Sequence, residues 1–348
     1  MKSTFVALPL IAMLGSGALL AQNYEPQPAE PARLAVESLL LDIERAGQRY
    51  VAVGERGHVL LSADGENWEQ AENVPVRSTL TRVAFSGGRL WAVGHDSTII
   101  HSRDLGRNWV LQHFDPEAEK PLLDVHFFDA NNGIAIGAYG LYMRTTNAGD
   151  SWETLDMADL VTSEDIDWDA IAAAEAGNTT MDEDLFGEEA LIDRGCYEFM
   201  ECHLNAFLDN GRGTWVIAGE RGYGFRSTDG GENWESFRFP YPGSMFGLLQ
   251  IENEIIAFGL RGHVQSSSDD GSAWVELENP LLSSLKGGSV DPRGRALMVG
   301  AGAAQLIYDP KTRRFELRED RLGDTYAAVL FREDGDKILV GEDGVSHE

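Results

Sequence analysis

The most regular feature of the chain is a short apolar run that ends in glycine and occurs seven times. Most residues of each run are Val, Ile, Ala or Leu, and polar segments flank it. The steps from one glycine to the next are 40, 43, 82, 40, 41 and 41 residues, so one step is double the rest. Such runs predict β-strands, and a period near 40 residues predicts repeated supersecondary units. The seven glycines are Gly54, Gly94, Gly137, Gly219, Gly259, Gly300 and Gly341.

A polar turn that ends in Trp follows the next strand in the first five repeats. The turn has the pattern Ser/Thr-x-Asp-x-Gly-x-x-Trp, with one residue fewer in the first copy and Asn in place of Asp in the third. Its hydroxyl and carboxylate can bond local backbone, its Gly can take positive φ, and its Trp can pack between sheets. We therefore expect structural turns that resemble the Asp box of bacterial neuraminidase (BNR) repeats. The acceptor and Trp positions are Asp64 and Trp68, Asp104 and Trp109, Asn147 and Trp152, Asp229 and Trp234, and Asp269 and Trp274.

Each repeat therefore has room for four short strands, as in the blades of a propeller with WD40-like or YVTN-like repeats. Seven such units predict an all-β fold, a seven-bladed β-propeller with four-stranded blades, over residues 36–348. The last unit ends at Glu348 without a fourth strand. We expect the N-terminal linker, residues 22–35, and its continuation to Ser38 to supply that strand and close the ring.

The first 21 residues differ in kind from the rest of the chain. Lys2 precedes an apolar run from Phe5 to Leu20, and the small residue Ala21 precedes a polar, Pro-rich stretch. This order predicts a signal peptide of residues 1–21 and a location in the periplasm. The run is short and contains Pro and Gly, so we expect no membrane insertion after cleavage; a retained N-terminal anchor is the alternative.

The charge of the chain limits its partners. With 28 Lys and Arg against 57 Asp and Glu, the net charge is −29. A nucleic acid would be repelled at long range, and adhesion to anionic lipid is disfavoured. We therefore expect no nucleic-acid partner.

An acidic insertion of about residues 156–201 separates the third repeat from the fourth and accounts for the doubled step. It contains fifteen acidic residues and one base, Arg194. Two short helices are plausible from its caps and apolar spacing, and the insertion reads either as a lid or docking arm or as a solvated, partly disordered loop. An Asp165-x-Asp167-x-Asp169 pattern lacks the Gly and Glu of a calcium loop, so we expect no metal site.

Both cysteines of the chain, Cys196 and Cys202, lie in one short segment. In an oxidising compartment we expect them to form a local disulfide. A metal site would need further ligands, and the sequence offers only His203 next to them.

The repeat phase identifies residues at the mouth of the central channel. Arg56, Arg221 and Arg261 occupy the same position in three Gly-x-Arg-Gly loops, two residues after the glycine. They either bind a carboxylate or an acidic segment of a partner, or pair with acidic neighbours such as Glu55 and Glu220. Further candidate binding residues, on the loops or at the start of inner strands, are His58, Tyr223, His263, Arg82 and Asp124.

The motifs described so far do not indicate an enzyme. A sialidase-like glycoside hydrolase would need an arginine cluster with a Tyr–Glu pair and an Asp, or two carboxylates at a set separation. We could assign no such set, no His spacing typical of a metal centre and no cofactor motif. We therefore expect a protein that is not an enzyme and has no cofactor.

Residues 36–348 resemble the photosystem II stability and assembly factor-like propellers. The resemblance rests on the strands ending in Val-Gly, on turns such as Ser227-Thr-Asp-Gly-Gly-Glu-Asn-Trp234, and on Gly-x-Arg-Gly. It implies an exported assembly factor that binds a membrane protein through an arginine-bearing surface. The acidic insertion departs from the photosynthetic pattern and favours a non-photosynthetic bacterial branch. There, the resemblance implies a scaffold or accessory factor for an inner-membrane complex or exporter subunit of the resistance-nodulation-division type. A carbohydrate- or peptide-binding propeller is the alternative.

Overall fold

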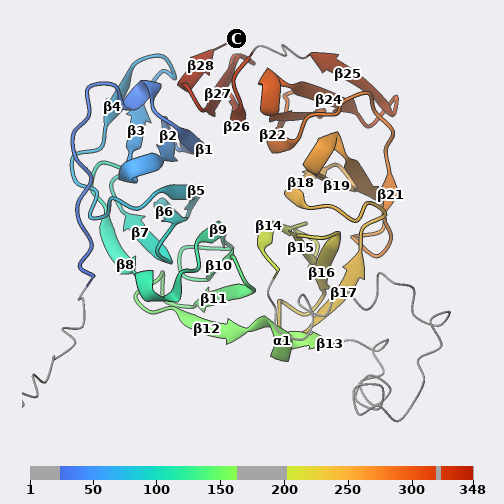
Figure 1. Ribbon diagram of the computed structural model, residues 1–348, viewed down its shortest axis with the longest axis horizontal. Helices are drawn as coiled ribbons and strands as arrows, with labels where there is room; N and C mark the ends of the chain where they lie inside the picture. The colour runs from blue at the N-terminus through green and yellow to red at the C-terminus, as the bar shows by residue number, and fades with distance from the viewer. Residues whose placement is uncertain (1–23, 163–201, 319–322, 348) are drawn as a thin grey trace, which may run out of the picture.

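The computed structural model describes residues 24–162, 202–318 and 323–347, which form a seven-bladed β-propeller (Figure 1). Each blade is an antiparallel sheet whose first strand lines the channel and whose last strand lies outermost. The strands are, in blade 1, β1 (Leu40–Ala46), β2 (Arg49–Gly54), β3 (Val59–Ser62) and β4 (Trp68–Gln70); in blade 2, β5 (Leu80–Ser86), β6 (Arg89–Gly94), β7 (Thr98–Ser102) and β8 (Val110–His113); in blade 3, β9 (Leu122–Phe127), β10 (Gly133–Gly137), β11 (Leu141–Thr145) and β12 (Glu153–Asp156); in blade 4, β14 (Leu204–Asp209), β15 (Trp215–Gly219), β16 (Tyr223–Ser227) and β17 (Trp234–Arg238); in blade 5, β18 (Met245–Ile251), β19 (Glu254–Gly259), β20 (Val264–Ser267) and β21 (Val275–Glu276); in blade 6, β22 (Leu285–Val290), β23 (Ala296–Gly300), β24 (Gln305–Asp309) and β25 (Arg314–Arg318); and in blade 7, β26 (Tyr326–Phe331), β27 (Lys337–Gly341) and β28 (Gly344–His347).

Short helical turns join some of these strands. They are η1 (Ala35–Glu37), η2 (Glu55–Gly57), η3 (Pro116–Ala118), α1 (Met157–Leu160), η4 (Leu260–Gly262) and η5 (Ala301–Ala303). After α1, the two-residue strand β13 (Val161–Thr162) pairs in parallel with β17 and gives blade 4 a fifth strand. The rest of the insertion, with its predicted helices, the Asp165 pattern and Cys196, lies outside the described residues. So does the predicted signal peptide. Cys202 is buried.

The glycine at the end of each second strand has a steric cause. A Cβ at Gly54 would lie 2.1 Å from the carbonyl oxygen of Leu39, and one at Gly300 would lie 1.9 Å from that of Ser284. In both places the chain that enters the inner strand passes directly over the glycine. A side chain cannot fit at this position, so glycine ends the second strand in every blade.

The core lies between blades, where apolar faces of neighbouring sheets pack together. Val51, Val83, Leu90 and Trp109, from blades 1 and 2, belong to one such buried cluster. The inner strands follow one another around the channel, and β26 lies beside β1 to complete the ring. Burial of this kind stabilises by about 25 cal/mol for each Å² of apolar surface removed from water.

The five predicted turns have the expected hydrogen bonds. In the first, the hydroxyl of Ser62 donates to Oδ1 of Asp64 (3.0 Å), and the same oxygen accepts the N–H of Asn67 (2.8 Å). The indole N–H of Trp68 donates to the carbonyl of Gly65 (3.0 Å). In the other four, the acceptor side chain likewise receives the hydroxyl and the N–H of the residue before the Trp: Asp104, Asn147, Asp229 and Asp269. These side chains therefore stabilise the turns through local hydrogen bonds.

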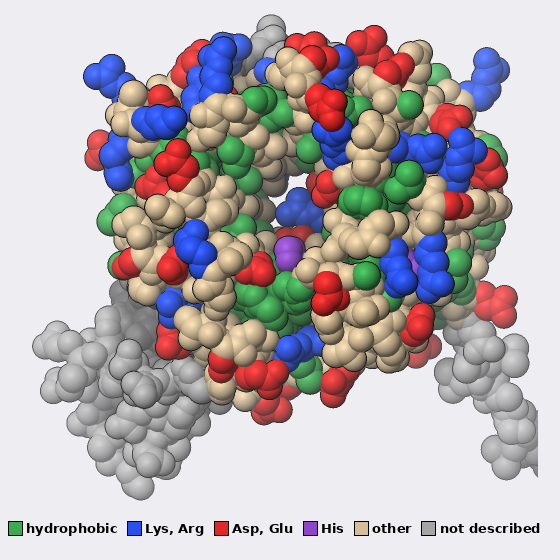
Figure 2. Space-filling model, turned by 180° about the vertical axis from the view of Figure 1, so that it is seen from behind, with side chains coloured by type: hydrophobic (Ala, Val, Ile, Leu, Met, Phe, Trp, Pro, Cys, Tyr) green, Lys and Arg blue, Asp and Glu red, His purple; other side chains and the backbone are tan. Residues whose placement is uncertain are grey.

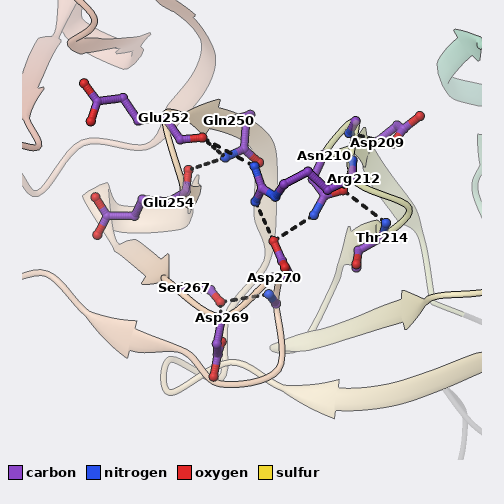
Figure 3. A network of polar contacts seen from close by, with 12 residues as sticks. Asp209, Asn210, Arg212, Thr214, Gln250, Glu252, Glu254, Ser267, Asp269 and Asp270 are labelled. Atoms are coloured by element: carbon purple, nitrogen blue, oxygen red, sulfur yellow. Dashed lines mark hydrogen bonds and ion pairs between the residues drawn. The ribbon is translucent and has the colours of Figure 1, made fainter.

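Polar contacts also connect neighbouring blades on the face that carries these turns, which we call the Asp-box face. Figure 3 shows one such network between blades 4 and 5, in which Arg212 forms an ion pair with Asp270. Nδ2 of Asn210 donates to the same Asp270 carboxylate (2.8 Å). The network is formed by hairpins of the two blades, so it fixes their relative position.

The prediction that the N-terminal segment supplies the fourth strand of blade 7 is wrong. Within the described residues, blade 7 has three strands, and residues 35–37 form the turn η1 instead of a fourth. Ala35 and Val36 pack into the apolar cluster between blades 7 and 1, and the carbonyl of Val36 lies against Gly344. The segment therefore covers one end of β28 instead of pairing along it.

Candidate functional site

The loop after the second strand has the same backbone conformation in blades 1 to 6. Its residue two places after the glycine lies in the left-handed region, with φ between 53° and 68°. This conformation costs a non-glycine residue about 1 kcal/mol. Glycine fills the position only in blade 6; the other five residues are Arg56, Asp96, Tyr139, Arg221 and Arg261. Bulky and charged side chains thus occupy positions where glycine would be less strained.

The three arginines of this set are exposed on one face of the propeller, which we call the loop face. The guanidinium groups of Arg56 and Arg261 have no ion pair within the described residues. The carbonyl of Arg221 accepts a hydrogen bond from Nη1 of Arg238 (2.7 Å). Glu220, a candidate partner for the arginines, instead lies 3.4 Å from Nδ1 of His203.

The order of the blades separates the arginines into two groups. Arg221 and Arg261 belong to the adjacent blades 4 and 5 (Figure 1). Arg56 belongs to blade 1, which is separated from them by two blades on either side. The three arginines are therefore distributed around the loop face and do not lie on consecutive blades. Spaced in this way, they suit contacts with an extended acidic partner.

The other loop residues singled out from the sequence are less accessible. His58 and Tyr223 are each only 3% exposed, and the guanidinium of Arg238 lies 3.7 Å above the Tyr223 ring. Nδ1 of His263 is within hydrogen-bonding distance of the Glu276 carboxylate, and its ring stacks on Tyr241, with ring centroids 3.4 Å apart. Burial also lowers the pKa of His58. We therefore place none of these three among the ligand contacts.

Arg82 and Asp124 lie in the channel, where they bind each other. Nε of Arg82 donates to Oδ1 of Asp124 (2.9 Å), and its Nη1 lies 3.5 Å from Oδ1 of Asp42 on the other side. The guanidinium thus bridges inner strands of blades 1, 2 and 3. Figure 2, which shows the face opposite to that of Figure 1, shows basic, acidic and histidine side chains at the channel wall.

The two channel carboxylates also hold backbone groups of the next blade. Oδ2 of Asp42 accepts the N–H of Val83 (2.9 Å), and Oδ2 of Asp124 accepts the N–H of Phe207 (2.8 Å). Burial raises the pKa of Asp42, and Arg82 opposes this effect. Asp42 and Asp124 are 6% and 5% exposed. Arg82, Asp42 and Asp124 therefore connect neighbouring blades, and these contacts leave few of their polar atoms available to bind a ligand.

Tyr308 and Glu254 form a Tyr–Glu pair that the sequence did not reveal. The hydroxyl of Tyr308 donates to Oε2 of Glu254 (3.3 Å), across blades 5 and 6. Tyr308 is fully buried, and burial raises its pKa to about 12, so it is not suited to act as a nucleophile. No group of three or more His, Cys, Asp or Glu within residues 24–162, 202–318 and 323–347 could hold a metal ion.

Over the same described ranges, no helix is long and apolar enough to cross a membrane. Neither a family model nor the sequence of a curated protein matches this chain. Solved structures do match it over nearly its whole length. The structure of YCF48 bound to D1 peptide has a TM-score of 0.63 and 17% identity, covering 93% of this chain and 94% of its own.

Two further structures give the same picture. YCF48 from Cyanidioschyzon merolae has a TM-score of 0.63 and 19% identity, with coverage of 90% of this chain and 95% of its own. The WD40 β-propeller domain of Doa1 has a TM-score of 0.61 and 11% identity, with coverage of 93% and 95%. At these identities the similarity concerns the fold alone: the chain is a seven-bladed propeller similar to YCF48 and to WD40 domains.

Proposed function

We propose that this chain is a non-catalytic scaffold or assembly factor of the periplasm that binds a complex of the inner membrane. An exporter of the resistance-nodulation-division type is the complex that we favour. The observation that carries the proposal is the presence of exposed arginines at strained, left-handed positions of the loop face. In a chain of net charge −29, such positions favour an acidic segment of a partner protein.

The expected location has separate support. It rests on the order of basic, apolar and small residues at the N-terminus, where we infer cleavage after Ala21. In the oxidising periplasm we also infer a disulfide between Cys196 and Cys202.

Binding of a peptide segment is the alternative that a specific finding favours. The similar propeller YCF48 has been solved with a D1 peptide bound. A propeller that holds a free or exported peptide would use the same exposed arginines. The two functions differ in the partner, which is an integral membrane protein in the first and a soluble peptide in the second.

The test substitutes Arg56 and Arg261 by Gly in one variant. Glycine relieves the left-handed strain of about 1 kcal/mol per site, and the greater freedom of the unfolded chain offsets about half of that or more. The variant should therefore be as stable as the parent or slightly more so. If the arginines served interblade ion pairs instead, the melting temperature would fall.

Arg313→Gly is the matched control. Arg313 has φ of 54° and a side chain that is 60% exposed, but it lies in the turn between β24 and β25 on the Asp-box face. The tagged chain is used for affinity capture from solubilised membranes of the source cells. We expect the parent and Arg313→Gly to recover one integral membrane protein, and Arg56→Gly/Arg261→Gly to recover at least about tenfold less.

Two results would overturn the proposal. One is equal recovery by the parent and the Arg56→Gly/Arg261→Gly variant. The other is hydrolysis of aryl glycosides by the purified chain, which would replace the scaffold by a glycosidase.

A further inference from the structure

The outer edge of blade 7 differs from that of the other six blades. In blades 1 to 6 a fourth strand pairs with the third, whereas within the described residues β28 pairs only with β27. No backbone hydrogen bond joins Val345 or Ser346 of β28 to a described residue on the other side. An unpaired strand edge is a template to which an extended segment can add.

The described N-terminal segment of the chain leads away from this edge. The N–H of Ala29 donates to the carbonyl of Val74 (3.0 Å), and Glu30 forms an ion pair with Arg77. Residues 29–32 therefore lie along the outer side of blade 1, at the left of Figure 1, and η1 reaches only the Gly344 end of β28. The described N-terminal segment therefore leaves the rest of this edge uncovered.

The two sides of β28 have different surroundings, which defines the side-chain pattern of such a segment. Val345 packs on the apolar cluster between blades 7 and 1, together with Val36, Trp68 and Leu330. Ser346 lines a cleft of about 380 Å³ between blades 6 and 7. Because side chains alternate along a strand, a segment beside β28 would place apolar side chains on the first side and its other side chains in the cleft.

The cleft favours a positive charge. Its lining includes three carboxylates, those of Asp324, Glu342 and Asp343. The pKa of Asp324 is raised because its carboxyl group forms a hydrogen bond with the carboxyl group of Asp343 and because the negative charge of Asp343 disfavours its ionisation. The basic group in the lining, Arg318, lies 2.9 Å from Glu316 and is already paired.

We propose that the edge of β28 binds an extended segment of a partner protein as the fourth strand of blade 7, with a Lys or Arg of that segment in the cleft beside Ser346. Backbone hydrogen bonds to β28 supply affinity, and the cationic side chain supplies specificity. The lining of the cleft includes neither Arg56 nor Arg261, and the proposal does not depend on the function proposed for these arginines.

The test uses the full chain and blocked seven-residue peptides that alternate Val with Thr and carry one central Lys. One control peptide has Glu in place of Lys, and a second has Pro in place of one Val, which removes a backbone N–H. Affinity is measured by calorimetry, and amide hydrogen exchange is followed in residues 344–347. We expect the Lys peptide to bind at least about tenfold more tightly than either control and to slow exchange in β28.

A double variant, Asp324→Asn/Asp343→Asn, tests the charge of the cleft. It should remove most of the preference for Lys over Glu, whereas Glu117→Gln/Glu278→Gln, which neutralises two exposed carboxylates elsewhere, should leave the preference unchanged. Three results would overturn the proposal: no binding of the Lys peptide at about 1 mM, equal affinity for the Lys and Glu peptides, or binding without slower exchange in residues 344–347.

Discussion

Replacement of Arg82 by Met should destabilise the propeller more at neutral pH than at acidic pH. The substitution keeps most of the length and apolar volume of the side chain but removes the charge that lies between Asp42 and Asp124. Two carboxylates that are 6% and 5% exposed would then face each other without a counter-ion. Breaking a buried ion pair by removing one partner costs about 3–5 kcal/mol, which corresponds to roughly 5–10 °C in melting temperature for a domain of this size.

The dependence on pH follows from the pKa of the remaining groups. Burial already raises the pKa of Asp42 in the presence of Arg82. Without Arg82, the folded-state pKa of Asp42 should rise further above its unfolded value, because the guanidinium no longer opposes the effect of burial. The cost of the substitution is then fully present at pH 7.5, and it decreases as the pH falls through the folded-state pKa toward about 4.

The assay is urea unfolding of the parent and Arg82→Met at pH 7.5 and pH 4.5. Arg103→Met removes an exposed arginine of the same blade and should change the free energy of unfolding by less than about 0.5 kcal/mol. Addition of Asp42→Asn and Asp124→Asn to Arg82→Met should restore much of the stability. A cost below about 1 kcal/mol, or the same cost at both pH values, would refute the role assigned to this pair.

Three further substitutions test other parts of the fold. Burial raises the pKa of Glu44 to about 7, so the folded state is destabilised at pH values where this carboxyl must ionise. Glu44→Gln should therefore increase the free energy of unfolding at pH 8.5 by up to roughly 3 kcal/mol and change it little at pH 5, as thermal unfolding at the two pH values would show. Hydrogen bonds from Asn233 hold the pKa of Asp229 at about 2, so Asp229→Asn should lower the melting temperature at pH 7, with a difference that disappears between pH 4 and pH 2. Gly300→Ala would place a Cβ against backbone and should abolish folding or cost several kcal/mol in a urea titration, whereas Gly47→Ala, with open space around it, should cost about 1 kcal/mol.

The blade count could be predicted from the sequence because its cause is local and repeated. Gly54 and its six equivalents end the second strand of their blades, and in each the incoming backbone passes close by. Each Asp-box turn is likewise complete within a few residues, as the contacts of Asp64 with Ser62 and Asn67 show. Because each such feature requires the same residue types at the same position of most repeats, the periodicity of the sequence reveals it.

The channel pair and the ring closure depend on contacts between distant residues, which periodicity does not reveal. Arg82 and Asp124 occupy equivalent places in neighbouring blades, so the repeat phase aligns them but does not show that they face each other. The fourth strand expected for blade 7 rests only on analogy with the other blades. In the structure, the packing of Val36 against Gly344 favours a tight turn over a strand.

Two regions of the propeller remain as candidates for recognition of a partner, and they carry opposite charges: the arginines of the loop face and the acidic cleft beside β28. Internal contacts occupy Arg82 and the Asp-box turns, whereas Arg56 and Arg261 have no ion pair within the described residues and the cleft beside β28 is rich in carboxylates. If both regions bound one segment, Arg56→Gly/Arg261→Gly would weaken binding of the Lys peptide as much as Asp324→Asn/Asp343→Asn does. We expect instead that each pair of substitutions affects only its own assay, because neither Arg56 nor Arg261 is among the residues that line the cleft. Loss in both assays from either pair would show that the two regions form one surface.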